Sequence, residues 1–241
     1  MKVHAIVVNW PFRFENVQKI EDLLSRLPAV KIVTVLNADP SHVVKRWISV
    51  DPSSRFSNQF YKAAKIFLDS DCDVMFFILG DAISKDWEKM VKNAVDCTKD
   101  NWGVLAPYID FSPWADSKFI YNQLSGKFLS NVMCTDGIVF FIDRKIVKWF
   151  VDICWYAFKD NFLGWGVDFC ICALSWLNGM NVIQDGSCKV VHMIGSGYSK
   201  KDAADQMDMT LSILNGSIKR YVDAVFRRDE KEIKLLFGVC L

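Results

Sequence analysis

The sequence lacks an excess of charge of either sign. Its 241 residues include 29 lysines and arginines and 28 aspartates and glutamates, which gives a formal net charge of +1. Proteins that bind nucleic acids electrostatically normally carry a basic surplus, so we expect no nucleic-acid partner. An anionic ligand would have to be held by a few local side chains.

Long apolar runs and paired cysteine motifs are also absent. The longest apolar runs, such as Val74 to Leu79, are far shorter than the roughly 20 residues that cross a bilayer, and the first residues show no signal-peptide pattern. The eight cysteines form no Cys-x-x-Cys pair and no Cys/His ligand series. We therefore expect reduced cysteines and a cytoplasmic protein.

Two common nucleotide-binding motifs do not occur. No Gly-x-Gly-x-x-Gly follows the first apolar run, and no Gly-x-x-x-x-Gly-Lys-Ser/Thr is present in the chain. A Rossmann dehydrogenase and a P-loop NTPase are therefore disfavoured. A nucleotide would have to be bound in another way.

Strand and helix patterns alternate along the first half of the chain. Short apolar runs predict strands at Val3 to Val8, Lys31 to Leu36 and Asp73 to Leu79, each buried on both faces. Apolar residues at helical spacing predict helices from Glu15 to Leu27 and from about Asn58 to Leu68. This β-α-β order predicts a parallel sheet with right-handed crossovers.

The second half departs from this alternation. A β-hairpin is predicted between Phe119 and Asn131, around a Ser-Gly turn. The remaining predicted elements are a helix from a Ser84 cap to about Thr98, a helix from Ile146 to Phe158, two helices after Lys201, and strands at Trp102 to Pro107, Gly137 to Ile142, Met180 to Ile183 and Lys189 to His192.

The chain shows no linker and no internal repeat, and its 51% hydrophobic content supports a large core. We therefore predict a single α/β domain with a mixed, mostly parallel sheet flanked by helices, a small hairpin and C-terminal helices. Residues 1–110 would form a nucleotide-binding half, residues 111–200 an acceptor and catalytic half, and residues 201–241 a helical tail.

Polar residues follow the predicted strands where open sheets of this kind bind ligands. Asn9 and Trp10 follow the first strand, Asp39 follows the second and Asp81 the third. Asp39 could accept hydrogen bonds from a base or a ribose, but it could also simply form a turn. Asp81 is either a ligand-binding acid or a cap for the helix near Ser84.

Two residues in loops are further candidates for ligand contact. Arg55 lies in a polar loop before the second helix, where it is either a phosphate ligand or a solvated side chain. Trp114 lies in the loop from Phe111 to Ser117, and it could stack on a sugar or plug the core. Sequence alone leaves these alternatives open.

The segment from Asn161 to Cys170 contains a Gly164-Trp165-Gly166 turn followed by Asp168. Glycines allow unusual backbone angles and close approach of a ligand, and an indole beside a single acid suits a sugar. The apolar spacing after Phe169 predicts a helix that places Asp168 in its first turn, where the helix dipole favours a carboxylate. Alternatively, Asp168 is an N-cap and Trp165 a core residue.

The order of these elements and turns resembles the GT-A nucleotide-sugar glycosyltransferases, namely family-2-like enzymes and galactosyltransferases with a Gly-Trp-Gly motif. The resemblance covers most of residues 3–195. It implies that Asn9, Trp10 and Asp39 hold the nucleoside, that Asp81 holds a metal ion and the sugar diphosphate, and that Asp168 is the catalytic base. Trp165 and Gly166 would then contact the acceptor.

The chain departs from the family pattern at the metal site. The family usually has two or three acids where this chain has Gly80-Asp81-Ala82, and a second acid often follows the base where this chain has Cys170. His192 could replace the lost ligand of a Mn²⁺ or Mg²⁺ ion, or it could be a hydrogen-bonded histidine at a strand end. We also expect Gly80 to leave room for a diphosphate.

The resemblance implies transfer of a sugar, with inversion, from a UDP-sugar to a saccharide or glycolipid acceptor, as in polysaccharide biosynthesis. The alternatives are a sugar-phosphate nucleotidyltransferase, whose glycine- and lysine-rich first loop is absent, and a non-catalytic carbohydrate-binding protein. Basic and apolar residues between Ile218 and Phe237 suggest peripheral contact with the inner membrane face, although a helix packed on its own domain is the alternative.

Overall fold

The computed structural model describes all residues except 111, 113–119, 124–127, 193–197, 228 and 238–241. Its strands are β1 (Val3–Asn9), β2 (Val30–Asn37), β3 (Ile48–Ser49), β4 (Val74–Leu79), β5 (Trp102–Asp110), β6 (Ile120–Gln123), β7 (Leu129–Val132), β8 (Val139–Asp143) and β9 (Asn181–Val191). Its α-helices are α1 (Phe14–Leu24), α2 (Phe56–Leu68), α3 (Trp87–Asp96), α4 (Arg144–Trp149), α5 (Val167–Leu177), α6 (Lys200–Ile213), α7 (Gly216–Arg227) and α8 (Glu230–Phe237).

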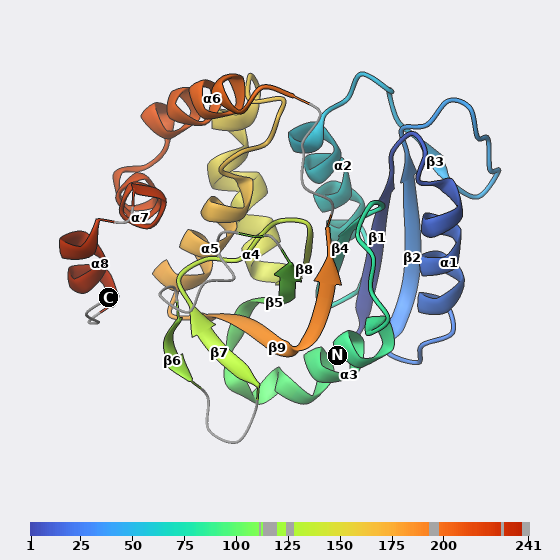
Figure 1. Cartoon of the computed structure of the whole chain (residues 1–241), viewed down its shortest axis with the longest axis horizontal. Coiled ribbons are helices and arrows are strands. Elements are labelled where there is room, and N and C mark those ends of the chain that lie inside the picture. Colours follow the sequence, from blue (N-terminus) through green and yellow to red (C-terminus); the bar gives the residue numbers. More distant parts are fainter. Residues whose placement is uncertain (111, 113–119, 124–127, 193–197, 228, 238–241) are drawn as a thin grey trace.

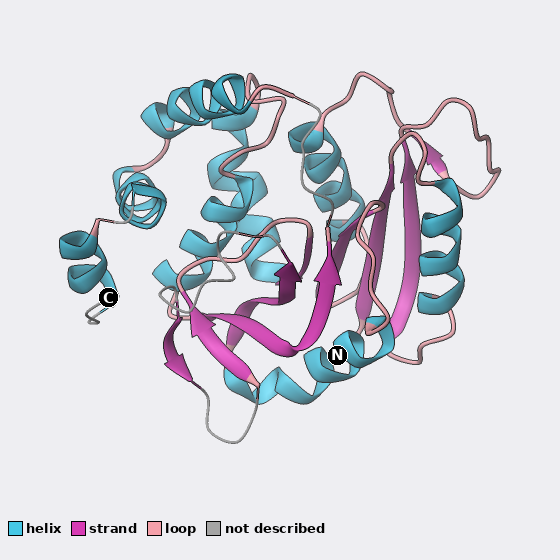
Figure 2. Ribbon diagram, in the orientation of Figure 1, coloured by secondary structure: helices cyan, strands magenta, loops and turns pink. Residues whose placement is uncertain are grey.

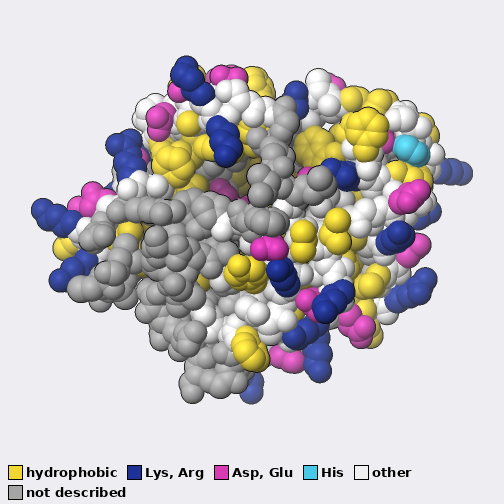
Figure 3. Space-filling view, in the orientation of Figure 1, with side chains coloured by type: hydrophobic (Ala, Val, Ile, Leu, Met, Phe, Trp, Pro, Cys, Tyr) yellow, Lys and Arg dark blue, Asp and Glu magenta, His cyan; other side chains and the backbone are white. Residues whose placement is uncertain are grey.

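The described strands form one mixed sheet in the order β3-β2-β1-β4-β8-β5-β9-β7-β6, with helices on both faces (Figures 1 and 2). Strands β1, β2, β3 and β4 run parallel, as do β5 and β9, whereas β8 lies antiparallel between β4 and β5. The expected α/β class with a sheet flanked by helices is confirmed. Charges of both signs are interspersed on the face drawn in Figure 3, in keeping with the near-zero net charge.

Strand β1 is buried along its whole length because a hydrophobic core lies on each side of the sheet. Ile6 and Val8 pack into the core beneath α2, α4 and α5, and Ala5 and Val7 pack into the core beneath α1 and α3. Val8 pairs with Leu36 of β2 and with Leu79 of β4. The carboxyl ends of β1, β2 and β4 therefore meet at one edge, as the β-α-β pattern predicts.

Some expected elements have different bounds. The segments at Met180 to Ile183 and Lys189 to His192 belong to one strand, β9, whose register against β5 shifts between Pro107 and Tyr108. Helix α3 begins only at Trp87, with Asp86 rather than Ser84 preceding it, so the expected Ser84 cap is wrong. The Ser84 hydroxyl instead accepts a hydrogen bond from the Asp86 N–H at 3.0 Å and donates to the Lys189 carbonyl at 2.6 Å.

The predicted hairpin between Phe119 and Asn131 and the predicted helix from Ile146 to Phe158 are both present in part. Strands β6 and β7 pair antiparallel, which confirms the hairpin, and its Ser-Gly turn lies outside the described residues. Helix α4 continues as one π-helical turn, Phe150–Cys154, and one 3₁₀ turn, Trp155–Phe158. The predicted helical stretch is therefore present, but it is not a regular α-helix.

The C-terminal tail forms three helices, where the sequence suggested two. The apolar face of α7 is buried: Val222 and Val225 are both 0% exposed, and the Tyr221 hydroxyl donates to the Met133 carbonyl. The interpretation of a helix packed on its own domain is therefore correct for α7. Among the residues that the model describes, no helix is both long enough and apolar enough to span a membrane.

Candidate functional site

The edge where β1, β2 and β4 end carries a buried amide network. Asn9, 0% exposed, donates from Nδ2 to Asn37 Oδ1 at 2.7 Å, and Asn37 Nδ2 donates to the His42 carbonyl at 2.6 Å. Trp10 follows β1 and packs, partly buried, against the core beneath α2. These contacts fix the positions of the two loops that the sequence assigns to the nucleoside.

Asp39 organises its own turn. Its Oδ1 accepts hydrogen bonds from the N–H and hydroxyl of Ser41, and its Oδ2 lies 2.9 Å from His42 Nδ1. The hydrogen bond from Ser41, followed by that from His42, lowers the pKa of the Asp39 carboxyl. With the side chain 1% exposed, these contacts match the turn interpretation, and contact with a nucleoside stays a prediction.

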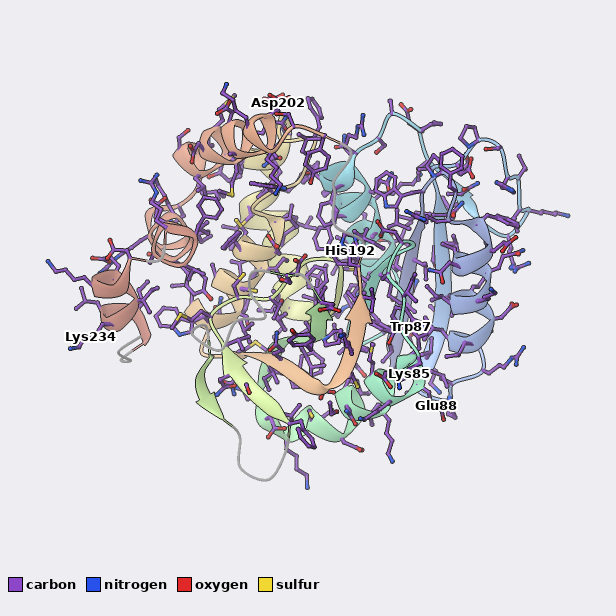
Figure 4. All side chains as sticks on the ribbon, viewed as in Figure 1. Lys85, Trp87, Glu88, His192, Asp202 and Lys234 are labelled. Carbon is purple, nitrogen blue, oxygen red and sulfur yellow. The ribbon has the colours of Figure 1, made fainter. Side chains whose placement is uncertain are left out.

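Asp81 and His192 form a pair at the centre of this edge. Asp81 follows β4 and His192 follows β9, and a bridge between Ile83 and Val191 holds the two segments together with hydrogen bonds of 2.9 and 2.8 Å. Asp81 Oδ2 lies 3.1 Å from His192 Nε2. Figure 4 shows His192 at the tip of β9, well away from α6, which carries Asp202. This contact matches the interpretation of His192 as a hydrogen-bonded histidine at a strand end, and its role as a metal ligand stays a prediction.

Burial and charge shift the pKa values of Asp81 and His192 in opposite directions. Burial raises the pKa of Asp81, but the hydrogen bond and charge of His192 outweigh it, so the pKa of Asp81 is lowered. Burial lowers the pKa of His192, but Asp81 outweighs it and the pKa is raised. Asp81 Oδ1 is buried and has no hydrogen-bond partner among the described residues, so one oxygen of the pair is unsatisfied there.

Arg13 is a site residue that the sequence reasoning missed. It closes the turn after β1, where its N–H donates to the Trp10 carbonyl at 3.1 Å. Its positive charge lowers the pKa of both Asp81 and His192, so Arg13 acts electrostatically on this pair. Arg55, the arginine singled out from sequence, is exposed and precedes α2. The sequence signal that could have identified Arg13 is a basic residue four positions after the end of the first strand.

Gly80 has a different role from the one expected. A Cβ at this position would lie 2.5 Å from the Val8 carbonyl oxygen and 2.6 Å from Val17 Cγ2. The missing side chain therefore points at β1 and α1, not into the ligand edge, and the expectation that Gly80 makes room for a diphosphate is wrong. Glycine here permits close packing of the strand end, where its N–H donates to the Val8 carbonyl at 2.8 Å.

The Gly-Trp-Gly turn needs both glycines for its backbone. Gly164 and Gly166 have φ angles of +82° and +99°, a region that other residues rarely adopt. The Asn161 side chain ties the turn together, since it accepts from the Gly164 N–H at 2.9 Å and donates to the Trp165 carbonyl at 2.8 Å. Trp165 is partly buried, and its indole N–H donates to the Tyr198 hydroxyl at 3.1 Å.

Asp168 lies in the first turn of α5, as predicted, but it is not the N-cap. Gly166 occupies the cap position. The Asp168 carboxyl accepts a hydrogen bond from the Phe169 N–H at 2.9 Å. Burial, followed by repulsion from Asp136, raises its pKa to about 7. A general base is most effective when its pKa lies near the working pH.

Asp136 is the second residue that the sequence reasoning missed. It precedes β8, and because β8 is antiparallel to β4, the start of β8 lies at the same edge as the end of β4. The Leu79 N–H donates to the Ile138 carbonyl at 2.9 Å there. Burial raises the pKa of Asp136 despite hydrogen bonds from Ser112 and from backbone N–H groups.

The donor set can be tested for a metal ion. No group of three or more His, Cys, Asp or Glu side chains with metal-ligating geometry occurs within the described ranges. Asp81 Oδ1 and His192 are two candidate ligands, and a divalent ion bound to a nucleotide commonly takes one or two carboxylates plus phosphate oxygens and water. Asp81 and His192 therefore stay predicted ligands of an ion that would be shared with a diphosphate. Trp114, an expected acceptor contact, lies outside the described residues.

No protein-family model matches the chain. No curated protein matches it in sequence. Solved structures do match. TarS residues 1–349 from S. aureus, in complex with UDP-GlcNAc, superimposes with a TM-score of 0.62 at 12% identity, over 96% of this chain and 73% of that chain. GalNAc-T7 with UDP, GalNAc and Mn²⁺ gives 0.58 at 10% identity, over 96% of this chain and 51% of that chain, and A197 from STIV gives 0.50 at 15% identity, over 81% and 87%.

At these identities the similarity establishes the fold. The chain shares a GT-A-like α/β fold with these structures, and it spans about half of the GalNAc-T7 chain.

Proposed function

We propose that this chain is a GT-A glycosyltransferase that transfers a hexose from a UDP-sugar to a hydroxyl group of a saccharide or glycolipid acceptor, with inversion. The observation that carries the proposal is Asp168. It combines a pKa of about 7 with a place at the sheet edge that also holds Asp81, His192 and Arg13. A base and a diphosphate-binding group are the two functions that the reaction needs.

The proposed roles follow from these positions. Asp168 takes the proton of the acceptor hydroxyl as its oxygen attacks the anomeric carbon, and Arg13 balances the negative charge of the departing diphosphate, with Arg55 as a further cation. Asp81 and His192 would hold a Mn²⁺ or Mg²⁺ ion, which supplies positive charge to the diphosphate when bound. A single displacement with a carboxylate base inverts the anomeric centre.

The binding sites for the nucleoside and for the acceptor follow from the same reasoning about residue positions. Residues 1–110 would bind the nucleoside through Asn9, Trp10 and Asp39, and residues 111–200 would bind the acceptor through Trp165, Gly166 and Trp114. TarS and GalNAc-T7 support a uridine nucleotide, since they were solved with UDP-GlcNAc and with UDP.

A non-catalytic carbohydrate-binding protein is the second candidate, because only one acid stands in Gly80-Asp81-Ala82. Slow hydrolysis of a UDP-sugar by the purified protein would separate a catalyst from a binding protein. A sugar-phosphate nucleotidyltransferase is less well supported, since the turn after β1 has no glycine- and lysine-rich loop.

Calorimetry tests the donor assignment. UDP is expected to bind more tightly with Mn²⁺ than in EDTA, and Asp81→Ala should remove this difference because it removes the unpartnered oxygen that would meet the ion. Asp86→Asn, five residues further along and outside the pair, is the matched control. Binding of GDP or CMP in preference to UDP would overturn the donor, and Mn²⁺-dependent binding by Asp81→Ala would overturn the metal ligand.

Peripheral membrane contact can rest only on α8. Leu235 is 63% exposed, but Lys219, Arg220 and Arg227 are ion-paired with Asp223 or Glu232. If α8 binds an anionic surface, Leu235→Asp should reduce sedimentation with phosphatidylserine vesicles. Equal sedimentation of the variant and the unmodified chain would refute membrane contact through this helix.

A further inference from the structure

The carboxyl groups of Asp136 and Asp168 are both influenced by the backbone at Gly137, at the edge where the ligand is proposed to bind. The N–H of Gly137 lowers the pKa of the Asp136 carboxyl and also that of the Asp168 carboxyl. Gly137 lies directly against Asp168, because a Cβ on Gly137 would be 3.2 Å from Asp168 Cβ and 3.8 Å from Asp168 Cγ. Asp136 directly precedes this contact, and its charge raises the pKa of Asp168, so the chain before β8 brings a second carboxyl group within electrostatic range of the proposed base.

The packing around this pair fixes its geometry. Segment 134–137 runs along the first turns of α5, where Thr135 Oγ1 lies 3.8 Å from Cys172 Sγ. Cys134 and Cys172 are both 0% exposed. A Cβ at position 137 would require Asp168 to shift by a few tenths of an ångström and would be in ordinary contact with the Phe56 ring. The start of β8 and the start of α5 are therefore closely packed at this point.

Two acids in such a place repel each other when both are ionised. Burial is the largest cause of the raised pKa of each, and Asp136 is the next cause for Asp168. His192 favours the charged form of Asp136. The pair in turn acts on two thiols, because Asp136 and Asp168 raise the pKa of Cys134 and Asp168 raises that of Cys170. The pKa of His192 is in turn raised by Asp81 and lowered by Arg13. Closely interacting acids of this kind release their protons as a pair.

We propose that Asp136 is a positioning residue for Asp168, and that the two carboxyl groups titrate as one coupled pair in which Asp136 sets the pH range where Asp168 can act as a base. The pair keeps one proton below the upper titration step and loses it above that step. In the ionised state Asp168 receives the acceptor proton, and the proton returns to solvent after product leaves. The catalytic consequence rests on the proposed function, but the coupled titration does not.

Carboxyl ¹³C NMR titration of the intact chain in EDTA measures the pair without any substrate. The Asp168 midpoint in Asp136→Asn is expected to fall by about one pH unit or more, because the neutral amide keeps the shape of the side chain and removes the repulsion. In Asp168→Asn the titration of Asp136 should become a single step, because the second carboxyl group of the pair is gone. Asp202→Asn, in the exposed first turn of α6, should change neither midpoint.

Activity separates this inference from the proposed function. If the chain transfers sugar, the acid limb of its pH profile should move to lower pH in Asp136→Asn by the same shift that NMR records. A midpoint of Asp168 that moves by less than about 0.3 units in Asp136→Asn would refute the pair. A coupled titration without any transfer or donor hydrolysis would instead refute the proposed function.

Discussion

Replacing Asp168 with asparagine is expected to reduce sugar transfer by about 10²–10⁴-fold while donor binding persists. The amide keeps the size of the carboxyl but cannot accept the acceptor proton. The donor groups, Arg13 and the Asp81–His192 pair, belong to the loop after β1 and to the ends of β4 and β9, so they should be unaffected. Initial rates with saturating UDP-sugar, beside UDP binding by calorimetry, measure the two effects separately.

The same variant should be more stable than the unmodified chain at alkaline pH. The folded-state pKa of Asp168 is raised from 3.8 to about 7, so the folded state binds this proton more tightly than the unfolded chain does. The stability from this group is fully present below about pH 4 and is lost as the pH rises to about 7. Above pH 7 the buried charge costs at most about 4 kcal/mol, which asparagine avoids.

Thermal unfolding at pH 4 and pH 8 would check this sign. Asp168→Asn should unfold at a higher temperature than the unmodified chain at pH 8 and at a similar temperature at pH 4. Asp202→Asn is the matched control, because Asp202 also lies in the first turn of a helix but is exposed. Transfer by Asp168→Asn within about tenfold of the unmodified rate would remove Asp168 from the role of base.

Alanine at Gly164 is expected to destabilise the chain by about 2–5 kcal/mol and to impair transfer. The φ angle of +82° costs an alanine about 1–2 kcal/mol, and overpacking adds about 1–3 kcal/mol. The new Cβ would lie 2.3 Å from Phe56 Cδ1 and 2.9 Å from Phe56 Cβ. Phe56 in turn faces Gly137, where a Cβ would be 3.5 Å from its Cζ, so the displaced ring would disturb the support of Asp168.

Gly179→Ala is the control that measures the cost of the positive φ angle alone, without overpacking. Its φ angle is +69°, and a Cβ there meets nothing within 4 Å. Gly179→Ala should therefore lose only about 1–2 kcal/mol of unfolding free energy in urea and keep its transfer rate. Equal losses in the two variants would show that contact between Gly164 and Phe56 contributes nothing to stability.

Local patterns predicted the parallel part of the fold well. Strands β1, β2 and β4 are short apolar runs, and β1 and β4 are buried along their whole length, as expected for strands covered on both faces of a parallel sheet. The expectation of full burial is wrong for β2, which is exposed or half-buried from Lys31 to Thr34. The bounds of α3 and the irregular continuation of α4 were not predictable, because Ser84 has a tertiary partner in Lys189 and the π-helical turn depends on packing. Long-range contacts decided these cases.

The site was predictable where side chains follow a parallel strand or a glycine turn. Asp81, His192 and Asp168 lie at the expected edge for that reason. Asp136 was missed because it precedes its strand, and only the antiparallel direction of β8 brings it to this edge. A side chain at position 80 would point toward Val8, and this direction depends on tertiary packing that no local sequence pattern reveals.

The place of β8 in the sheet has a consequence for how the polypeptide can be divided. Strand β8 comes from the second half of the chain, yet it lies between β4 and β5 of the first half. A fragment that ends at residue 110 would leave β4 with an unpaired edge and β5 without either neighbour, since β9 is also lost. Residues 1–110 and 111–200 are therefore interleaved in one sheet, and neither segment is a module that could be exchanged, duplicated or produced separately.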